Sequence, residues 1–173
     1  KMTIKELFKY CSDQLAFTDD CSFEAFCIFN DVLGFSKDKI LFNTEIVTTE
    51  HQKKIDVVIN RRKNGEPLQY ILGKWDFYDL TFSVGEGVLI PRPETELLVD
   101  LAIEKMKNIE NPVIYDLCSG TGCIGLTIAK HLNNAKVYLL EKEKKAFEYL
   151  TKNREDLNID NVTIINDDLF TVD

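Results

Sequence analysis

Apolar positions in the first seventy or so residues recur at the spacing of α-helices. Thr3 and Glu6 match a capping box, in which two side chains bond the free amides at a helix start, and Thr49 and Gln52 repeat the pattern. Gly34 is suited to end a helix. The helices expected from these signals cover residues 4–17, 22–33, 36 to about 42, and 49 to about 65. This part of the chain therefore predicts a small helical bundle.

The spacing changes after Pro67, which breaks the last of these helices. Residues 74–84 alternate and are rich in aromatic and β-branched side chains, which predicts a β-hairpin. From residue 113 the pattern runs strand, helix, strand, helix, strand, which predicts a parallel sheet. The strands are expected at 113–116, 136–141 and 162–166. We expect an α/β chain in three parts: the helical bundle over 1–72, a hairpin and Pro-Arg-Pro linker over 73–93, and a partial Rossmann-like domain over 94–173.

A glycine-rich loop follows the first of these strands. Residues 113–126 predict a strand that ends in Asp116, a small-residue turn and the start of a helix, as in the nucleotide sites of doubly wound α/β domains. Gly120 and Gly122 let the backbone turn sharply and let a ligand approach it closely. Together with Gly125 they also match the dinucleotide fingerprint, so the loop by itself leaves the ligand open.

Two acids bear on the choice of ligand. Asp116 would repel a pyrophosphate over the loop and attract a cation, and S-adenosylmethionine carries a sulfonium and an ammonium but no phosphate. The alternative for Asp116 is an acid that caps backbone amides before a turn. Glu141 lies about twenty residues past the glycines, where a carboxylate accepts the ribose hydroxyls of NAD or of S-adenosylmethionine. The alternative for Glu141 is a solvated acid in the charged run 141–145.

A stiff segment precedes the sheet. Pro91 and Pro93 fix an extended backbone with Arg92 between them, and Pro93 opens a helix expected to run to about residue 107. One interpretation is a rigid linker and a well-capped helix. The other is that the segment presents Arg92, Thr95 and a helix N-terminus to a ligand. The pattern leaves both interpretations open.

The composition is that of an ordinary globular chain, 45% hydrophobic and 29% charged. No apolar run approaches the ~20 residues that cross a bilayer, and the start has no signal-peptide pattern. The net charge of −8 argues against broad binding to a phosphate backbone. Five cysteines without a Cys-x-x-Cys pair argue against a disulfide framework or a zinc site and favour a reducing cytosol. His51 and His131 have no partner ligands nearby, so no metal site is expected.

Several segments together resemble the HemK/PrmC methyltransferases, which modify the side-chain amide of a glutamine in peptide chain release factors. The matching segments are Glu66–Gly73, Phe77–Tyr78, Phe82–Val84, Val88–Glu96, Asp116–Ile124 and Asp168–Phe170. The pairing of Leu-Ile-Pro-Arg-Pro-Glu-Thr-Glu with a Gly-x-Gly loop is highly specific, whereas a lone glycine fingerprint is not. The resemblance covers essentially the whole chain.

The resemblance implies a cytoplasmic enzyme that uses S-adenosylmethionine to methylate the glutamine of the release factor's Gly-Gly-Gln motif. Its expected cofactor-binding residues are Asp116, Cys118, Ser119, Gly120, Thr121, Gly122, Glu141, Asp168, Leu169, Arg92 and Thr95. The loop would cradle the methionine part, Glu141 would hold the ribose, and Asp168 with Leu169 would border the adenine. The Pro-Arg-Pro segment would line the cofactor entrance. The family usually has glycine at the position of Cys118, and we expect the small cysteine to keep the loop intact.

The partner implied by the resemblance is the release factor, docked on the helical domain, with no direct nucleic acid and no membrane. The family's catalytic signature Asn-Pro-Pro-Tyr, which holds the glutamine amide and follows the fourth strand, does not occur in these 173 residues. No catalytic residue is therefore assigned. Three strands would leave an unpaired edge and an uncovered sheet face. We accordingly expect a longer enzyme with the signature beyond Asp173, and no activity from residues 1–173 alone.

Other functions fit parts of the same pattern. A DNA or RNA adenine methyltransferase uses a similar cofactor domain and loop, but the acidic charge and the small helical domain argue against it. A non-catalytic module could dock a protein through the helical domain alone. An NAD-dependent oxidoreductase is disfavoured by Asp116 and by the lack of a glycine loop near the chain start. The residues that follow Asp173 would separate these functions.

Overall fold

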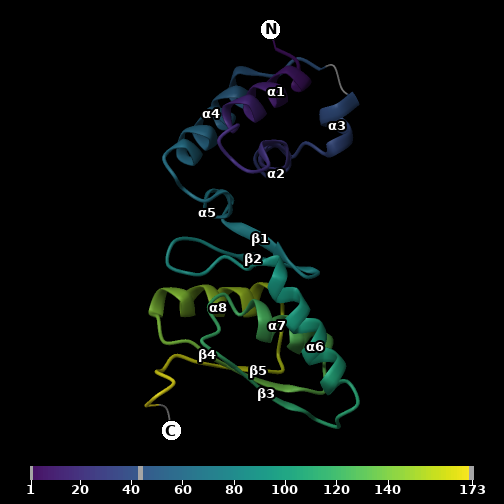
Figure 1. The fold of residues 1–173 in the computed structure, drawn as a ribbon, viewed down its shortest axis with the longest axis vertical. Helices are drawn as coiled ribbons and strands as arrows, with labels where there is room; N and C mark the ends of the chain where they lie inside the picture. Colours follow the sequence, from purple (N-terminus) through teal and green to yellow (C-terminus); the bar gives the residue numbers. More distant parts are fainter. Residues whose placement is uncertain (1, 43–44, 172–173) are drawn as a thin grey trace. The chain divides into compact units, whose positions relative to one another are not determined.

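The computed structural model describes residues 2–42 and 45–171. The chain divides into two compact units, Lys1–Leu72 and Gly73–Asp173, which Figure 1 draws in sequence colours. Each unit has a hydrophobic core of its own. Among the described residues, no helix combines the length and the apolar character that crossing a membrane requires.

The first unit is the predicted helical bundle (Figure 1). Its helices are α1 (Ile4–Gln14), α2 (Cys21–Leu33), α3 (Lys37–Phe42), α4 (Thr49–Lys63) and α5 (Leu68–Leu72). All five contribute buried apolar side chains to one core. Phe8 of α1 packs against this core, with its ring centroid 4.6 Å from that of Phe26 and 5.4 Å from that of Phe29. Gly34 ends α2 with a left-handed backbone, as predicted, whereas α1 ends three positions earlier than expected, at Gln14 and not at residue 17.

The capping box predicted at Thr3 is present at the start of α1. The one predicted for α4 at Thr49 and Gln52 is wrong by one residue. Thr48 is the cap, because its backbone is extended and its hydroxyl accepts from the His51 amide at 3.1 Å. The ring nitrogen Nδ1 of His51 in turn accepts from the Thr48 amide at 3.4 Å. Histidine thus takes the place that the usual sequence pattern reserves for glutamate or glutamine.

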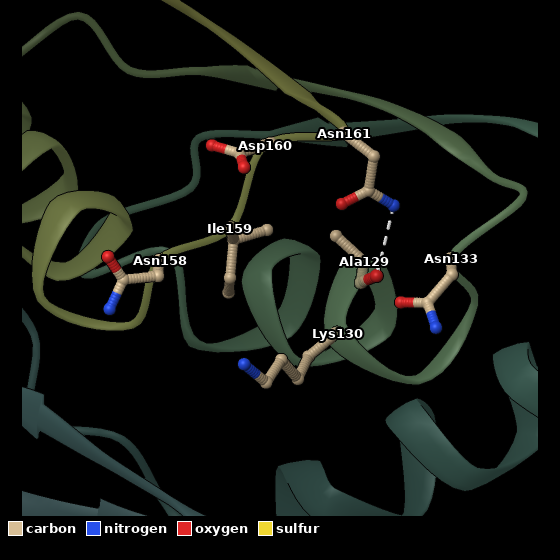
Figure 2. A pocket seen from close by; sticks show the side chains of 7 residues that line it. All are labelled: Ala129, Lys130, Asn133, Asn158, Ile159, Asp160 and Asn161. Atoms are coloured by element: carbon tan, nitrogen blue, oxygen red, sulfur yellow. Dashed lines mark hydrogen bonds between the residues drawn. The ribbon is translucent and has the colours of Figure 1, made fainter.

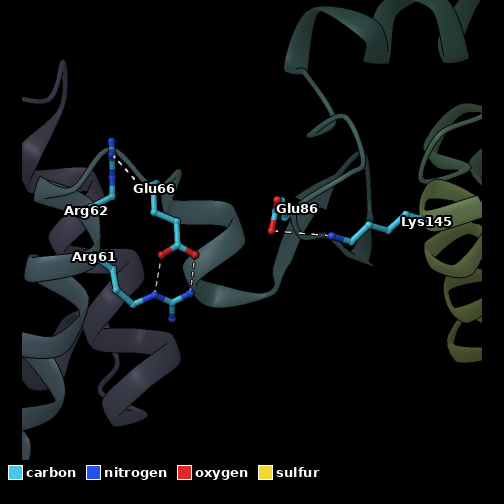
Figure 3. Close-up of polar contacts among 5 residues, drawn as sticks. All are labelled: Arg61, Arg62, Glu66, Glu86 and Lys145. Carbon is cyan, nitrogen blue, oxygen red and sulfur yellow. Dashed lines mark hydrogen bonds and ion pairs between the residues drawn. The ribbon is translucent and has the colours of Figure 1, made fainter. Parts of the chain in front are cut away.

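Two arginines at the end of α4 hold the turn into α5 (Figure 3). Arg61 forms a bidentate pair with the Glu66 carboxylate, through Nε at 2.7 Å and Nη2 at 2.5 Å, and it lowers the pKa of Glu66. Arg62 donates to the Glu66 carbonyl at 3.2 Å. The break at Pro67 is therefore present as predicted. The single-turn helix α5 that follows it was not expected, because five residues are too few to show a helical period.

The second unit contains a hairpin and an α/β domain (Figure 1). Its elements are β1 (Lys74–Phe77), β2 (Leu80–Ser83), the short 3-10 helix η1 (Pro93–Thr95), α6 (Glu96–Met106), β3 (Val113–Leu117), α7 (Cys123–His131), β4 (Lys136–Leu140), α8 (Lys144–Asp156) and β5 (Val162–Ile165). Strands β1 and β2 pair antiparallel, with Trp75 opposite Phe82. The hairpin and the three later strands agree with the sequence prediction to within one or two residues.

Strands β3, β4 and β5 form a parallel sheet in that order. Helices α6, α7 and α8 lie on the same side of it (Figure 1), and their buried apolar side chains belong to one core with Val137 and Leu139 of β4. Parallel strands end at the same edge, so the segments that follow β3, β4 and β5 meet there. On the other side, Val113, Tyr115 and Leu117 of β3 are exposed, by 66% at Tyr115.

Candidate functional site

The loop between β3 and α7 folds back over the ends of β3 and β4. The Ser119 amide donates to the Leu140 carbonyl at 3.0 Å, and the Ser119 hydroxyl donates to the Asp116 carbonyl at 2.7 Å. The backbone is left-handed at Cys118, Gly120 and Gly122, with φ of 63°, 57° and 80°. The sequence predicts a tight turn at this place, and these torsions form it.

Cys118 is exposed and holds a backbone that L-residues rarely adopt. The left-handed conformation costs a residue with a Cβ about 1 kcal/mol or more, whereas glycine adopts it freely. This conformation explains why glycine is suited to the position. The loop keeps its turn with cysteine there, and the Ser119 bonds on the C-terminal side help to hold it.

The three glycines of the loop serve different purposes. A Cβ on Gly120 would meet only the Val88 side chain, at 4.0 Å, so the space in front of Gly120 is open to a ligand. A Cβ on Gly122 would lie 2.5 Å from Leu150, and one on Gly125 would lie 2.8 Å from Asp116 Oδ2. Gly120 therefore faces open space, whereas Gly122 and Gly125 are closely packed on the side where a Cβ would stand, and contact of Gly122 with a ligand stays a prediction.

Asp116 lies at the end of β3 with its carboxylate half-buried. Its Oδ2 accepts a hydrogen bond from the Gly125 amide at 2.9 Å, so the acid does cap a backbone amide. Burial raises the pKa of Asp116 to about 6, the Gly125 bond opposes that rise, and the charge of Glu141 adds to it. Within the described residues, Oδ1 makes no hydrogen bond, so an acceptor remains for a cationic group.

Glu141, directly after β4, is 7% exposed and is not a solvated member of the charged run. Its Oε2 accepts from the Gly120 amide at 2.8 Å, and its Oε1 accepts from the Glu143 amide at 2.8 Å. An ionised carboxylate has about four acceptor positions, so both oxygens can still accept a hydroxyl. The bond to Gly120 places a buried acid against the one part of the loop that is open.

The segment after β5 is tied to the segment after β4. Asn166 donates to the Glu141 carbonyl at 2.7 Å, and Asp168 pairs with Lys142 Nζ at 2.8 Å. The Lys142 ammonium lowers the pKa of Asp168. Leu169 is 38% exposed. Asp168 and Leu169 therefore lie on a segment bonded to the residues around Glu141, beside the loop.

Arg92 and Thr95 are less closely connected to this site. The Arg92 side chain is exposed, and neither residue caps η1 or α6 through its side chain. Within residues 2–42 and 45–171, neither forms a side-chain hydrogen bond or ion pair with the loop. Val88, at the start of the same segment, is the residue that approaches Gly120. A role for Arg92 and Thr95 in ligand binding stays a prediction.

One buried polar residue at the site was not identified from the sequence. Asn153 of α8 is 1% exposed and donates to the Thr121 carbonyl at 3.0 Å. The available signal was its position in the helix, three residues after Leu150 and seven after Ala146, on the apolar face. A polar side chain in such a row requires hydrogen-bond partners.

A hollow of about 450 Å³ lies at the opposite edge of the sheet, where α7 ends and β5 begins (Figure 2). Its lining includes Lys130, Asn158 and Asn161. Asn161 donates to the Ala129 carbonyl at 3.0 Å, as Figure 2 shows. Since the loop follows the other ends of the strands, this hollow is separate from the candidate site. Over the described ranges, no group of three or more His, Cys, Asp or Glu side chains is placed to hold a metal ion.

The chain matches two protein families, one in each half. Residues 6–73 match the PrmC N-terminal domain, and residues 94–172 match the family described as rRNA small subunit methyltransferase G.

A release factor glutamine methyltransferase from Thermodesulfovibrio yellowstonii is 44% identical over 137 residues, which are 77% of this chain and 49% of that protein. Another, from Buchnera aphidicola subsp. Acyrthosiphon pisum, is 34% identical over 170 residues, which are 98% of this chain and 61% of that protein. The chain thus spans about half the length of the curated relatives it matches. A solved structure of M. jannaschii TYW2 in complex with AdoMet aligns with 57% of this chain and 44% of its own, at 25% identity and a TM-score of 0.47.

Proposed function

This chain belongs to the family of the release factor glutamine methyltransferases, and we propose on that basis a function for the whole protein. It transfers a methyl group from S-adenosylmethionine to the side-chain amide nitrogen of a glutamine in a peptide chain release factor. The proposed setting is the cytoplasm, where release factors act on ribosomes. The proposed partner is the release factor itself.

The observation that carries the cofactor assignment is the 2.8 Å bond between the buried Glu141 carboxylate and the Gly120 amide. This bond joins an acid placed to accept ribose hydroxyls to the glycine loop, which faces open space at Gly120. Asp116 adds a second acid behind the loop, which suits a cationic ligand without phosphate. These residues fit S-adenosylmethionine better than a dinucleotide, because Asp116 would repel a pyrophosphate over the loop, whereas Glu141 suits the ribose of either ligand.

The roles proposed for this chain's residues are those that the family resemblance implies, and the positions of the loop and of Glu141 agree with them. The loop 118–122 holds the methionine part, Glu141 accepts the ribose hydroxyls, and Asp168 with Leu169 borders the adenine. Asp116 offsets the positive charge of the cofactor's ammonium or sulfonium group. The bound cofactor supplies an electrophilic methyl group. Arg92 and Thr95 line its entrance.

The acceptor is a weak nucleophile, since an amide nitrogen shares its lone pair with the carbonyl. Holding that nitrogen in line with the methyl group therefore supplies much of the rate. The Asn-Pro-Pro-Tyr signature that does this in the family does not occur in the 173 residues. We therefore expect residues 1–173 by themselves not to transfer a methyl group.

The test incubates the full-length protein with isotope-labelled S-adenosylmethionine and a purified release factor, followed by mass spectrometry of the glutamine-containing peptide. We expect one methyl group on the glutamine of the Gly-Gly-Gln motif, none on a release factor with that Gln→Asn, and none with residues 1–173 alone. Robust methyl transfer by residues 1–173 would contradict the placement of the catalytic signature beyond Asp173.

A second substrate class deserves an arm in the same assay, because residues 94–172 match a small-subunit rRNA methyltransferase family. The match covers the cofactor domain and not the helical unit, and the net charge of −8 disfavours a large RNA surface. We expect no label on small ribosomal subunit RNA. Labelled rRNA together with an unmodified release factor would reverse the assignment.

A further inference from the structure

Asn153 lies on the inward face of α8, in a row with the buried residues Ala146 and Leu150. At 1% exposure its amide is removed from water, which is costly unless each polar atom finds a partner. Every polar atom of the side chain does find one, and the partners come from two other segments.

The three bonds of Asn153 join the end of the hairpin to the glycine loop. Its Oδ1 accepts from the Ser83 amide at 2.6 Å, and its Nδ2 donates to the Ser83 carbonyl at 3.1 Å. The Asn153 side chain therefore bonds both backbone groups of Ser83, the last residue of β2, as a neighbouring strand would. Its second amide hydrogen goes to the Thr121 carbonyl at 3.0 Å. A single side chain thus bridges β2, α8 and the loop.

Packing against α8 supports the loop and the hairpin exit as well. Leu150 lies under the loop, where a Cβ on Gly122 would come within 2.5 Å of it. Tyr149, the preceding residue, lies against Gly85 so closely that any Cβ on that glycine would overlap its hydroxyl. One face of α8 is therefore a common platform for both segments.

Lys145, one helical turn before Tyr149, adds to the same face of α8. A Cβ on Gly87 would lie 2.5 Å from the Lys145 side chain, whose Nζ pairs with Glu86 at 3.8 Å (Figure 3). Val88 then reaches the open front of Gly120. The hairpin exit is thus fixed to α8 at one end and borders the cofactor space at the other.

We infer that Asn153 is a positioning residue for cofactor binding, one that acts through the loop and touches no ligand. The bond from Asn153 holds the Thr121 carbonyl toward α8 and so opposes a flip of the peptide between Thr121 and Gly122. The loop therefore keeps its binding conformation before the ligand arrives. A loop ordered in advance loses less conformational entropy on binding, so affinity is higher. The inference rests on the proposed function, because it takes the loop to be the cofactor cradle.

Asn161 offers a control that also donates to backbone carbonyls. Its Nδ2 shares its two hydrogens among three of them, those of Ala129, Leu132 and Ala135, at 3.0, 3.1 and 3.1 Å. These bonds hold the end of α7 at the edge of the sheet away from the loop. Removing either asparagine amide should destabilise the protein, but only Asn153 should affect the cofactor.

The experiment measures S-adenosylhomocysteine binding by calorimetry for the full-length protein and for its Asn153→Ala and Asn161→Ala variants, well below their unfolding temperatures. Methyl transfer to the release factor gives KM for S-adenosylmethionine and kcat separately. Asn153→Ala should raise the dissociation constant and that KM by about tenfold, the worth of one well-placed hydrogen bond, with a smaller change in kcat. Asn161→Ala should leave both constants within about twofold of the unchanged protein.

If Asn153→Ala fails to fold, Asn153→Ser takes its place, since its short uncharged side chain cannot make all three bonds and buries no charge. It should weaken binding similarly and speed hydrogen exchange at the loop amides. Equal dissociation constants for the two asparagine variants, or an Asn153 variant that binds normally, would overturn the inference alone. Absence of binding by the unchanged protein would overturn the proposed function, and the inference with it.

Discussion

Asp116 and Glu141 are bonded to backbone amides on either side of the same turn, those of Gly125 and Gly120. Their charges add, and the burial of Asp116 makes its ionisation costly, with its pKa raised to about 6. An acid with this pKa changes its charge within the pH range of ordinary buffers. Its effects on stability and on binding should then have opposite signs, because ionisation is unfavourable in the empty protein and favourable beside a cation.

Asp116→Asn should therefore stabilise the protein and weaken its hold on the cofactor. The folded pKa of about 6 lies above the ordinary 3.8, so the folded state holds its proton more tightly and stability falls as pH rises from about 4 to about 6. The loss amounts to about 3 kcal/mol at most and persists above pH 6. Urea unfolding at pH 4.5 and 7.5 should show a smaller fall for the variant, and calorimetry at pH 7.5 should show weaker S-adenosylmethionine binding. An unchanged pH dependence would contradict the assignment of that titration to Asp116.

Glu141→Ala in the full-length protein should weaken cofactor binding by roughly 1.5–3 kcal/mol, because a charge-assisted bond to each ribose hydroxyl is lost. Some stability should be lost as well, since the amides of Gly120 and Glu143 lose their acceptor. Glu143→Ala, an exposed neighbour in the same charged run, is the control and should leave affinity unchanged. Calorimetry with S-adenosylhomocysteine measures both. Equal affinities for the two variants would exclude Glu141 from cofactor binding.

At the scale of elements, the sequence predicted the helices and strands that short-range patterns of apolar residues mark. The period-2 stretch at 74–84 gave the hairpin, and the alternation from residue 113 gave the parallel sheet. The misses at the candidate site have tertiary causes, whereas α5 and the cap of α4 were missed for local reasons. Asn153 is recognisable as important only once Ser83 and Thr121, distant in sequence, are known to lie beside it. The turn torsion of Cys118 likewise depends on how the loop folds over β4.

The shifted cap of α4 gives a test at this scale. Thr48→Ala should lower the free energy of unfolding of the first unit by about 1 kcal/mol, because the amide of His51 loses its acceptor. Thr49→Ala, already inside the helix, should change it by less than about 0.5 kcal/mol. Urea unfolding followed by circular dichroism compares the two. A larger loss at Thr49 would restore the sequence prediction and remove the cap from Thr48.

At the scale of the whole molecule, each hydrogen bond described for the candidate site comes from the second unit, Gly73–Asp173. The first unit has its own core and no part in those bonds. A single glutamine side chain offers little surface, so a protein substrate needs a docking surface elsewhere. We propose that the helical unit docks the release factor and that the second unit binds the cofactor.

Deleting residues up to Leu72 from the full-length protein should therefore abolish methylation of an intact release factor. Cofactor affinity should stay within about twofold, because the loop keeps its contacts with α8 and β4. Calorimetry and the methylation assay on the same preparation test the two halves. Loss of cofactor binding with retained docking of the release factor would reverse this division of labour.

The central claim is that the glycine loop and the two acids form a site for S-adenosylmethionine and not for a dinucleotide. Titration calorimetry of the full-length protein with S-adenosylhomocysteine and, separately, with NAD tests it most directly. We expect saturable binding of S-adenosylhomocysteine and no measurable heat with NAD, since Asp116 would repel the pyrophosphate over the loop. Tight NAD binding without binding of S-adenosylhomocysteine would contradict it.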